Sequence, residues 1–394
     1  MNYILFDDVN SNNLLPLTFT RPVADLRIGI LTIREKWEKM LGVKTSSRTK
    51  EYLSKKFPLE FAIDTDNVWI NGGVCPNEKL IEELKTLEPY QALMSMGHVL
   101  AVNTGNERFL SEELNEDFIR FESHAQALRV EHPWDLFAKN GEAIKADFDL
   151  ITAGRKSLAL SATNQVMGVE NIFVEEGAKV ECAILNATGG PIYIGKDAEI
   201  MEGSIVRGPL ALCEHSALKL GAKIYGPTTI GPHSKIGGEV NNSVIIGYSN
   251  KGHDGFLGNS VLGEWCNIGA DSNNSNLKNN YAEVKLWNYT KERFVPTGLT
   301  FCGLIMGDHS KCGINTMFNT GTVVGVNANI FGSGFPRNFV PSFSWGGAAG
   351  FTTYKTKDAF EVAARVFERR GMIFNETEQE ILTHVFELTE KYRK

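Results

Sequence analysis

The sequence predicts an α/β domain followed by a parallel β-helix and a short helical tail. Three observations predict this fold class. Aliphatic residues recur at steps of six through the middle of the chain, the residues before them follow mixed helical and strand patterns, and the last residues have helical spacing. With 394 residues, 42% of them hydrophobic, the chain is long enough for two domains with a sizeable core.

Residues 1–160 are expected to form the α/β domain. YILFDD near the amino terminus predicts a short strand, residues 29–41 an amphipathic helix, and NVWING a second strand. The six-residue repeat does not occur in this part of the sequence. We therefore expect its core to be built from separate helices and strands.

The six-residue repeat predicts the β-helix. A period of six fits neither an α-helix nor an amphipathic strand. It fits a triangular coil in which each edge sends one residue inward and turns at small residues, so that about eighteen residues complete one coil. The inward residues follow one another in two series: Ile200, Val206, Leu212, Leu218, Ile224, Ile230 and Ile236, then Met306, Cys312, Phe318, Val324 and Ile330.

The repeat begins near Ile172 and ends near Ile330. One segment inside it, residues 279–300, does not follow the pattern, and we expect it to loop out of the β-helix. The expected domains are 1–160 (α/β), 165–337 (β-helix) and 338–394 (helical extension).

The carboxy-terminal extension is expected to be helical. Residues 357–370 have apolar side chains at helical spacing, and Gly371 is a plausible stop. A second helix is expected after Asn375. We expect both helices to pack against the end or side of the β-helix and to cover its open edge.

Composition excludes several classes of partner. The net charge of −7 at pH 7 disfavours non-specific binding to nucleic acid and to anionic membranes. The first residues, MNYILFDDVN, lack a basic segment and do not resemble a signal peptide, and no apolar run reaches the length of a membrane span. The six cysteines are scattered without a CxxC pair, which favours free thiols in the cytoplasm over disulfides or a metal site.

Four polar residues between positions 239 and 276 form a specific pattern. Glu239 is followed fourteen residues later by His253 in SNKGHDGFLG, then by Asn267 in CNIGAD and Asn276 in NNSNLK. The segment resembles the acetyltransferase half of the bifunctional N-acetylglucosamine-1-phosphate uridyltransferase/glucosamine-1-phosphate acetyltransferase family. That family has a glutamate, then K-A-G-H-L-T-Y-L-G, N-I-G-A-G and C-N-Y at the same spacings. The resemblance implies a left-handed β-helix that assembles as a homotrimer, with the site between subunits.

The resemblance also implies roles for these residues. Moving an acetyl group from a thioester to a sugar amine or hydroxyl needs a base that takes the proton of the acceptor. A histidine titrates near neutral pH, and a carboxylate fixes its orientation and tautomer. His253 is then the general base and Glu239 its partner, while Asn267 and Asn276 hold the acceptor or the acyl donor. The alternative is that His253 is a surface histidine at a β-helix corner.

Departures from the family pattern bear on the substrate. A family tyrosine falls on Phe256, and a lysine that helps to bind the sugar phosphate falls on Asn241. Asparagine offers hydrogen bonds to a phosphate but no positive charge. We therefore expect another amino sugar or a sugar nucleotide, rather than glucosamine-1-phosphate, to be the acceptor. FPRNFV resembles the family segment T-R-N-V, which places Arg337 where it would meet the phosphates of coenzyme A. Acetyl-CoA is the implied acyl donor.

The amino-terminal domain resembles sugar-1-phosphate nucleotidyltransferases with an eroded site. LLPLTFTRP resembles their L-x-P-L-T-x-x-x-P-K stretch, and VWINGGVCPNEKLIEELK their later strand and helix. The loop that cradles nucleotide phosphates on backbone N–H groups reads DDVNSNN here, without a glycine. The family lysine falls on Val23 and the metal-binding aspartate on Gly73. We expect a divergent domain, with Mg²⁺ as a cofactor only if the domain is active.

The motifs together predict a sugar or sugar-nucleotide acyltransferase of the cytoplasm that uses acetyl-CoA. The alternative enzyme is a sugar-1-phosphate nucleotidyltransferase that acts through the first domain, with Asp7 or Asp8 recruited to the metal. Magnesium-dependent release of pyrophosphate separates the two. A third hypothesis is a non-catalytic relative that binds a sugar nucleotide.

Overall fold

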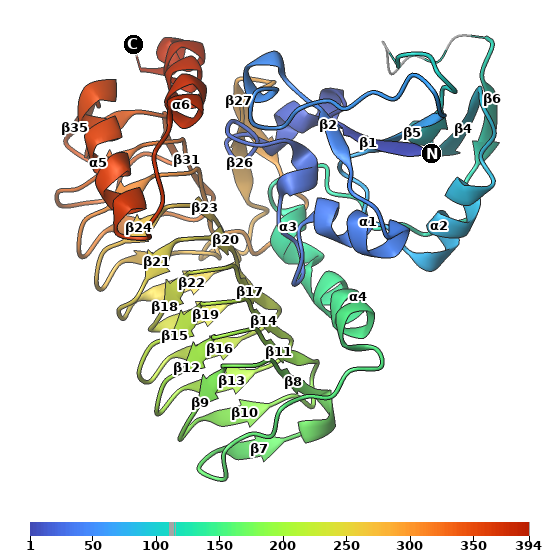
Figure 1. Cartoon of the computed structure of the whole chain (residues 1–394). Helices are drawn as coiled ribbons and strands as arrows, with labels where there is room; N and C mark the ends of the chain where they lie inside the picture. Colours follow the sequence, from blue (N-terminus) through green and yellow to red (C-terminus); the bar gives the residue numbers. More distant parts are fainter. Residues whose placement is uncertain (110–113, 115, 394) are drawn as a thin grey trace. The chain divides into compact units, whose positions relative to one another are not determined.

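The structure is a computed structural model that describes residues 1–109, 114 and 116–393. The chain divides into two compact units (Figure 1). Unit 1 comprises residues 1–14, 20–26 and 31–131, and unit 2 comprises residues 15–19, 27–30 and 132–394. The three domain ranges expected from the sequence stay predictions. Every helix in the described residues is too short or too polar to cross a membrane.

Unit 1 is an α/β unit built on a mixed sheet, as expected. The strand order is β2-β1-β3-β5-β4-β6, in which β1 pairs in parallel with β2 and β3 while β5 is antiparallel to β3 and β4. Helix α1 begins at Ile33, later than the pattern predicted, because the Thr32 side chain and Glu35 form a capping box there. The elements are β1 (Asn2–Phe6), α1 (Ile33–Leu41), β2 (Ser46–Arg48), β3 (Asn67–Asn71), α2 (Glu78–Lys85), β4 (Gln91–Ser95), β5 (His98–Asn103) and β6 (Ile119–Glu122).

Unit 2 contains the predicted β-helix, which is confirmed as a parallel β-solenoid with three faces. Each coil contributes a short strand to each face, and strands of successive coils pair in parallel. Face 1 holds β7 (Gln165–Met167), β10 (Ile184–Asn186), β13 (Ile205–Arg207), β16 (Lys223–Tyr225), β19 (Glu239–Asn241) and β22 (Phe256–Gly258). Two further strands, β25 (Asn273–Asn274) and β30 (Met317–Phe318), pair with each other.

The other two faces are longer. Face 2 holds β8 (Ile172–Val174), β11 (Ile192–Ile194), β14 (Leu210–Leu212), β17 (Thr228–Ile230), β20 (Val244–Gly247), β23 (Val261–Glu264), β28 (Leu304–Met306), β31 (Thr322–Val324) and β33 (Phe339–Val340). Face 3 holds β9 (Lys179–Val180), β12 (Glu199–Ile200), β15 (Ala217–Leu218), β18 (Lys235–Ile236), β21 (Asn250–Lys251), β24 (Asn267–Ile268), β29 (Lys311–Cys312), β32 (Asn329–Ile330), β34 (Ser344–Gly347) and β35 (Gly350–Thr353).

The core of the solenoid consists of the inward residues of the repeat. All of those predicted from the six-residue period are at most 5% exposed and lie in one continuous cluster. Ile200 pairs with Leu218, and Leu212 with Ile230, so the successive coils that carry these residues are related by eighteen residues as predicted. Inward side chains of neighbouring coils therefore stack on one another, and this stacking sets the register of every outward residue.

One coil is shorter than the others. Ile230 pairs with Ile245 and Ile236 with Lys251, fifteen residues further along instead of eighteen. The shortened coil places a lysine, only 1% exposed, at a position that aliphatic residues occupy in the coils on either side. His253 follows two residues later.

Stacked rings run along the corner between faces 2 and 3. The ring centroids of His215 and His233 lie 4.8 Å apart, those of His233 and Tyr248 4.8 Å, and those of Tyr248 and Trp265 4.4 Å. Phe367 of the carboxy-terminal tail stacks on Trp265 at 4.1 Å. This contact fixes helix α5 against face 3, next to the coils that carry His253 and Asn267.

The inserted segment and the helices of the carboxy-terminal tail are of the type that the sequence predicted. The segment outside the repeat leaves the solenoid as an antiparallel hairpin of β26 (Lys285–Asn288) and β27 (Arg293–Pro296). The tail holds α5 (Thr356–Glu368) and α6 (Glu376–Leu388), and the Asn375 side chain caps α6 by accepting from the Glu378 N–H. Two further helices, α3 (Asp135–Ala138) and α4 (Asn140–Thr152), precede the first coil.

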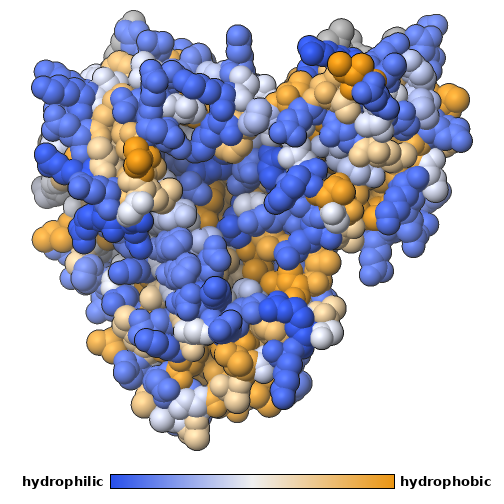
Figure 2. Space-filling view, in the orientation of Figure 1, coloured by the Kyte–Doolittle hydropathy of each residue, from blue (hydrophilic) through white to orange (hydrophobic). Residues whose placement is uncertain are grey.

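Exposed hydrophobic residues gather at the first coils. Figure 2 shows them at the lower end of the solenoid, where β7 and β10 lie in Figure 1. Met167 and Ile205 point outward from face 1, and Leu158 and Val169 are exposed beside the first coil. A cluster of this kind is typical of a surface that contacts another protein.

The stacking of inward side chains in the solenoid core leads to a prediction about stability. Leu218 is fully buried, and Leu218→Ala is expected to lower the free energy of unfolding by about 2–5 kcal/mol because it leaves a cavity in the core. Leu220 is 68% exposed and provides a matched control, so Leu220→Ala should change this free energy by less than about 0.5 kcal/mol. Urea denaturation followed by circular dichroism measures both. Equal effects would contradict the assigned inward positions.

The second prediction concerns assembly. We expect a homotrimer in solution, because a lone solenoid leaves long faces and the hydrophobic cluster at its first coils open to water. Multi-angle light scattering at micromolar concentration measures the mass directly. A strict monomer would rule out both the trimer and a site shared between subunits.

Candidate active site

His253 lies at the corner where the chain passes from β21 on face 3 to β22 on face 1. Its side chain is exposed, and no hydrogen bond or ion pair is found for its ring among the described residues. Its backbone carbonyl accepts a hydrogen bond of 2.9 Å from the Nζ of Lys251. The ring is therefore accessible to a ligand, while the hydrogen bond from Lys251 fixes the turn that carries it.

Lys251 is the unusual residue beneath this turn. Its Nζ donates to the carbonyl oxygens of Gly237 and His253, both at 2.9 Å, and so joins two successive coils. Burial lowers the pKa of Lys251 to about 8, because an ammonium group loses hydration in the core. We did not anticipate this residue from the sequence, since the shortened coil breaks the six-residue step that would have marked it as inward.

Glu239 lies in the coil next to that of His253. A Cβ atom at the neighbouring Gly238 would lie 2.8 Å from the His253 carbonyl oxygen, so the two coils are in close contact at this corner. The carboxylate of Glu239 accepts a hydrogen bond of 2.5 Å from the Tyr225 hydroxyl. This bond raises the pKa of Tyr225 to about 12. No hydrogen bond joins Glu239 to the His253 ring within the described residues, so the orienting role of Glu239 stays a prediction.

The other predicted residues of face 1 lie beside Glu239. Glu239 is in register with Phe256, and Asn241 with Gly258, on adjacent strands. On the opposite side Glu239 is in register with Lys223, whose side chain is exposed. Lys223 was missed in the sequence; it places a cation opposite Glu239, whereas Tyr225 lies opposite Asn241.

Asn276 lies at the other edge of face 1. Its amide Nδ2 donates to Oδ1 of Asn259 at 2.8 Å. Asn259 follows β22 at the corner between faces 1 and 2, whereas His253 precedes β22 at the corner between faces 3 and 1. The structure therefore places Asn276 and His253 at opposite edges of face 1 within one subunit.

A cavity of about 770 Å³ over face 3 brings His253 and Asn267 together. The end of helix α5 closes it on one side through Val366 and the residues that follow. Five cationic side chains line this cavity, and its described lining residues include no carboxylate. The lining favours a negatively charged ligand. The cations are Lys219, Lys235, Lys311, Arg369 and Arg370.

Four of the lining residues form a single outward column on face 3. Lys235 is in register with Asn250, Asn250 with Asn267, and Asn267 with Lys311. Their strands, β18, β21, β24 and β29, are consecutive in the sheet. His253 projects from the corner that follows the second of these strands. We call these four residues the face 3 column.

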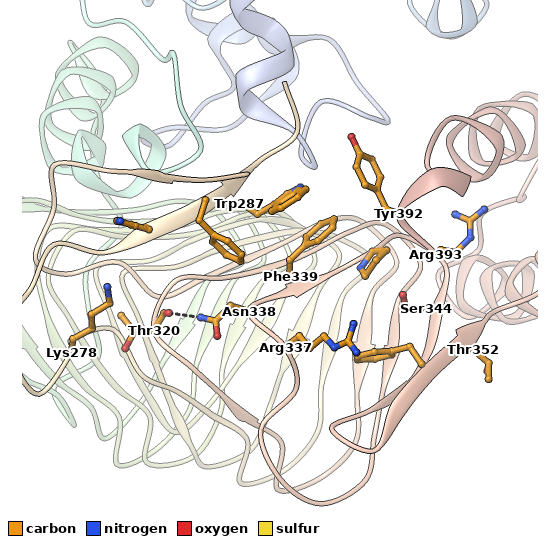
Figure 3. A pocket seen from close by; sticks show the side chains of 14 residues that line it. Lys278, Trp287, Thr320, Arg337, Asn338, Phe339, Ser344, Thr352, Tyr392 and Arg393 are labelled. Carbon is orange, nitrogen blue, oxygen red and sulfur yellow. Dashed lines mark hydrogen bonds between the residues drawn. The ribbon is translucent and has the colours of Figure 1, made fainter. Parts of the chain in front are cut away.

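Arg337 lies in a second cavity, of about 810 Å³, at the last coils. Figure 3 shows it with Lys278 on the lower side, below the rings of Trp287 and Phe339. These two rings are stacked, with centroids 4.3 Å apart. Because Trp287 belongs to β26, the inserted hairpin helps to build this cavity. The two cavities share no lining residue.

In unit 1 the segment DDVNSNN does not form a phosphate loop. Residues Val9–Leu14 form a short 3-10 helix. The Asp8 carboxylate accepts from the Asn10 N–H at 2.9 Å and from the Asn71 amide at 3.0 Å. Asp7 accepts from the Val23 N–H at 2.8 Å, and burial raises its pKa to about 6. Both acids are thus engaged with the chain itself.

The sequence resemblance places the family's metal-binding aspartate at Gly73. A Cβ atom there would lie 2.8 Å from the Val130 carbonyl oxygen, closer than real Cβ contacts, so a larger residue needs a shift of the backbone. Together with the engaged Asp8, this geometry does not fit the Mg²⁺ site of nucleotidyl transfer.

Comparisons with known proteins relate the chain to transferases. Residues 3–156 match the family model described as "Sugar nucleotidyl transferase". The chain is 30% identical over 160 residues to the "Bifunctional sugar-1-phosphate nucleotidylyltransferase/acetyltransferase" of Sulfurisphaera tokodaii, which covers 40% of this chain and 37% of that protein. It is 35% identical over 89 residues to the "Bifunctional protein GlmU" of Methanocaldococcus jannaschii, which covers 23% of this chain and 21% of that protein.

Among solved structures, the UDP-N-acetylglucosamine acyltransferase of Francisella novicida is 14% identical, with a TM-score of 0.29 over 59% of this chain and 78% of that chain. The chain spans 37% and 21% of the length of the two curated relatives described above. The resemblance found in the sequence is confirmed: a domain that matches the sugar nucleotidyl transferase model precedes a β-solenoid, and one relative is named a bifunctional sugar-1-phosphate nucleotidylyltransferase/acetyltransferase.

The geometry of unit 1 predicts weak binding of nucleoside triphosphates. Without glycine in DDVNSNN, backbone N–H groups cannot approach the phosphates closely, and Gly73 supplies no carboxylate for a metal. Calorimetric titration of the full chain with UTP and MgCl₂ should give no binding, or binding only at millimolar concentration. Tight magnesium-dependent binding would overturn this prediction and favour nucleotidyl transfer.

Proposed function

We propose that the solenoid of unit 2 transfers an acetyl group from acetyl-CoA to a sugar or a sugar nucleotide, with His253 as the general base. The observation that carries this proposal is the exposed ring of His253 at the edge of a cavity lined by five cations and no carboxylate in its described lining. Acetyl-CoA and a sugar-nucleotide acceptor both carry phosphate groups, and a cationic cavity attracts them. The relatives named as acetyltransferases support the reaction class.

For this transfer the protein has to supply a general base and to hold the two substrates in the correct position. A nitrogen of His253 takes the proton of the acceptor amine or hydroxyl as that group attacks the thioester carbonyl carbon. The carbon–sulfur bond then breaks, and the thiolate of coenzyme A leaves with a proton returned by the imidazolium. Lys251 holds the turn beneath His253, and Asn267 offers an amide to the bound substrate.

The second cavity supplies a place for the nucleotide end of the donor. Arg337 has an exposed side chain there, and the stacked rings of Trp287 and Phe339 offer a surface for a base. The two cavities have no lining residue in common among the described residues of one chain.

The test of this proposal is the loss of transfer in variants of His253. His253→Ala should lower the rate by about two to four orders of magnitude, the usual contribution of a general base. Glu239→Gln should lower it less, because the glutamine still accepts the Tyr225 hydrogen bond. The measurement is release of coenzyme A thiol from acetyl-CoA, with a panel of amino sugars, sugar phosphates and nucleotide sugars as acceptors.

His124 provides the matched control, since it is an exposed histidine outside both cavities. His124→Ala should leave the rate unchanged. All three variants should keep the circular dichroism spectrum and the oligomeric mass of the parent protein, because none of the side chains is buried in a core. An unchanged rate in His253→Ala would remove the catalytic assignment.

A second candidate function is sugar-1-phosphate nucleotidyl transfer by unit 1. The match of residues 3–156 to the sugar nucleotidyl transferase family favours it. The engaged Asp8 carboxylate and the closed position at Gly73 argue against it. Release of pyrophosphate from a nucleoside triphosphate and a sugar 1-phosphate, dependent on magnesium, would establish this activity in place of the first.

A further inference from the structure

Lys311 combines access to the cavity over face 3 with a poorly hydrated ammonium group. It lines that cavity from β29, and its side chain is half-buried. Its Nζ donates a hydrogen bond of 2.8 Å to the His309 carbonyl oxygen. The described residues that line the cavity include no carboxylate that could pair with it. An ammonium group with little hydration and no counter-ion loses its proton more easily than one in water.

The ionisable group that acts on Lys311 does not supply the missing negative charge. This group is the thiol of Cys266, whose pKa burial raises to about 12, so the thiol is uncharged at neutral pH. Burial accordingly lowers the pKa of Lys311 to about 8. At pH 7.5 about a quarter of such an amine is unprotonated, against about 0.1% of a lysine with the ordinary pKa near 10.4. Only the unprotonated amine is a nucleophile.

Two other lysines have one of these properties each. Burial also lowers the pKa of Lys251 to about 8, but its side chain is 1% exposed and donates to two carbonyl oxygens inside the solenoid. Lys235 lines the same cavity, but its side chain is exposed to water. Lys311 therefore differs from Lys251 in its access to the cavity and from Lys235 in its hydration.

We propose that Lys311 is a self-acetylation site, at which the Nζ amine takes the acetyl group of a thioester that enters the cavity over face 3. This inference rests on the proposed function, because that reaction supplies the thioester, acetyl-CoA. The unprotonated amine attacks the thioester carbonyl carbon, and an amide bond forms. The carbon–sulfur bond breaks, and the departing thiolate takes up the proton that the nitrogen releases. No general base is needed, since the attacking amine is already unprotonated.

Acetylation changes the charge of the cavity and leaves the side chain in place. The acetylated Nζ still carries one N–H, which can donate to the His309 carbonyl oxygen. Its positive charge is lost, so four of the five cationic side chains remain. A cavity with less positive charge attracts a phosphorylated ligand less strongly. Modification of Lys311 is thus a means by which accumulating acetyl donor limits the activity of the same site.

The experiment measures where acetyl groups accumulate on the full chain. The protein is incubated at pH 7.5 with acetyl-CoA and, in a separate arm, with S-acetyl-N-acetylcysteamine, a small thioester without phosphate groups. Peptide mass spectrometry then gives the acetylation rate of each lysine. Lys311 should react about tenfold faster than Lys235, because a gain of more than about a hundredfold in unprotonated amine is only partly offset by its weaker basicity and its burial. Lys251 should stay unmodified, because its amine is out of reach of the cavity.

The pH dependence of the reaction gives a second readout. The acetylation rate of Lys311 should rise up to about pH 8 and level off above about pH 9, because an amine with a pKa of about 8 is then almost fully unprotonated. A rate that still rises steeply above this range would contradict the lowered pKa of Lys311 and, with it, the selectivity of the site.

Two variants test the assignment further. Arginine keeps the positive charge but is not acetylated, so Lys311→Arg should remove the fastest signal and leave the rate at Lys235 unchanged. With the small thioester, His253→Ala should leave the acetylation of Lys311 unchanged, because the step uses no general base. Circular dichroism checks that both variants are folded, and the comparison among the lysines of the parent protein depends on neither variant.

The outcome separates this inference from the proposed function. The inference is overturned if Lys235 or Lys219 is acetylated as fast as Lys311 with either donor, or if neither donor modifies Lys311. Acetylation of Lys311 by the small thioester, with no lysine modified by acetyl-CoA, supports the reactive amine and argues against acetyl-CoA as the donor of the proposed function. Selective acetylation of Lys311 without transfer to any acceptor sugar supports the inference and rejects the proposed function.

Discussion

Stacking of inward side chains in register is the constraint on which the solenoid depends. Each coil sends one residue of each edge into a core that is only a few side chains wide, and neighbouring coils contact along their whole length. A shift by one residue would turn these side chains out to water, so the register is strongly held. The same register brings outward residues from distant parts of the chain into straight columns. The face 3 column and the stacked rings beginning at His215 are both products of this one constraint.

The candidate site lies where this regularity is broken. A coil of fifteen residues puts Lys251 among aliphatic neighbours, and its ammonium group bonds the turn of His253 to the coil below. A buried amine is costly unless it is hydrogen-bonded, so the bonds to both carbonyl oxygens offset part of that cost. The shortened coil also aligns Asn250 with Lys235. An irregularity in the core therefore organises both the proposed base and the proposed binding surface.

The two units differ in whether the expected site residues are present and available to a ligand. In unit 1 the residues that would bind phosphate and metal are replaced or engaged, as the bonds of Asp8 and the closed position at Gly73 show. In unit 2 the cations and amides around His253 are exposed or half-buried and lie in one cavity. This contrast explains why we assign the chemistry to the solenoid, although the family match itself covers residues 3–156. The structure also places Lys223 opposite Glu239 on the neighbouring strand, which the sequence alone did not reveal.

The sequence by itself determined the solenoid, its eighteen-residue coil, the looped insert and the two tail helices, because periodicity and capping are local signals. It also singled out His253 and Asn267, which the structure brings to one cavity. Only the tertiary structure decided which cations join them. Lys235, Asn250, Asn267 and Lys311 are separated by 15, 17 and 44 residues, so no constant period connects them. Arg370 comes from a helix outside the repeat. Which residues become neighbours in the cavity depends on the positions of the shortened coil and of the inserted hairpin along the solenoid. The packing of whole coils sets these positions.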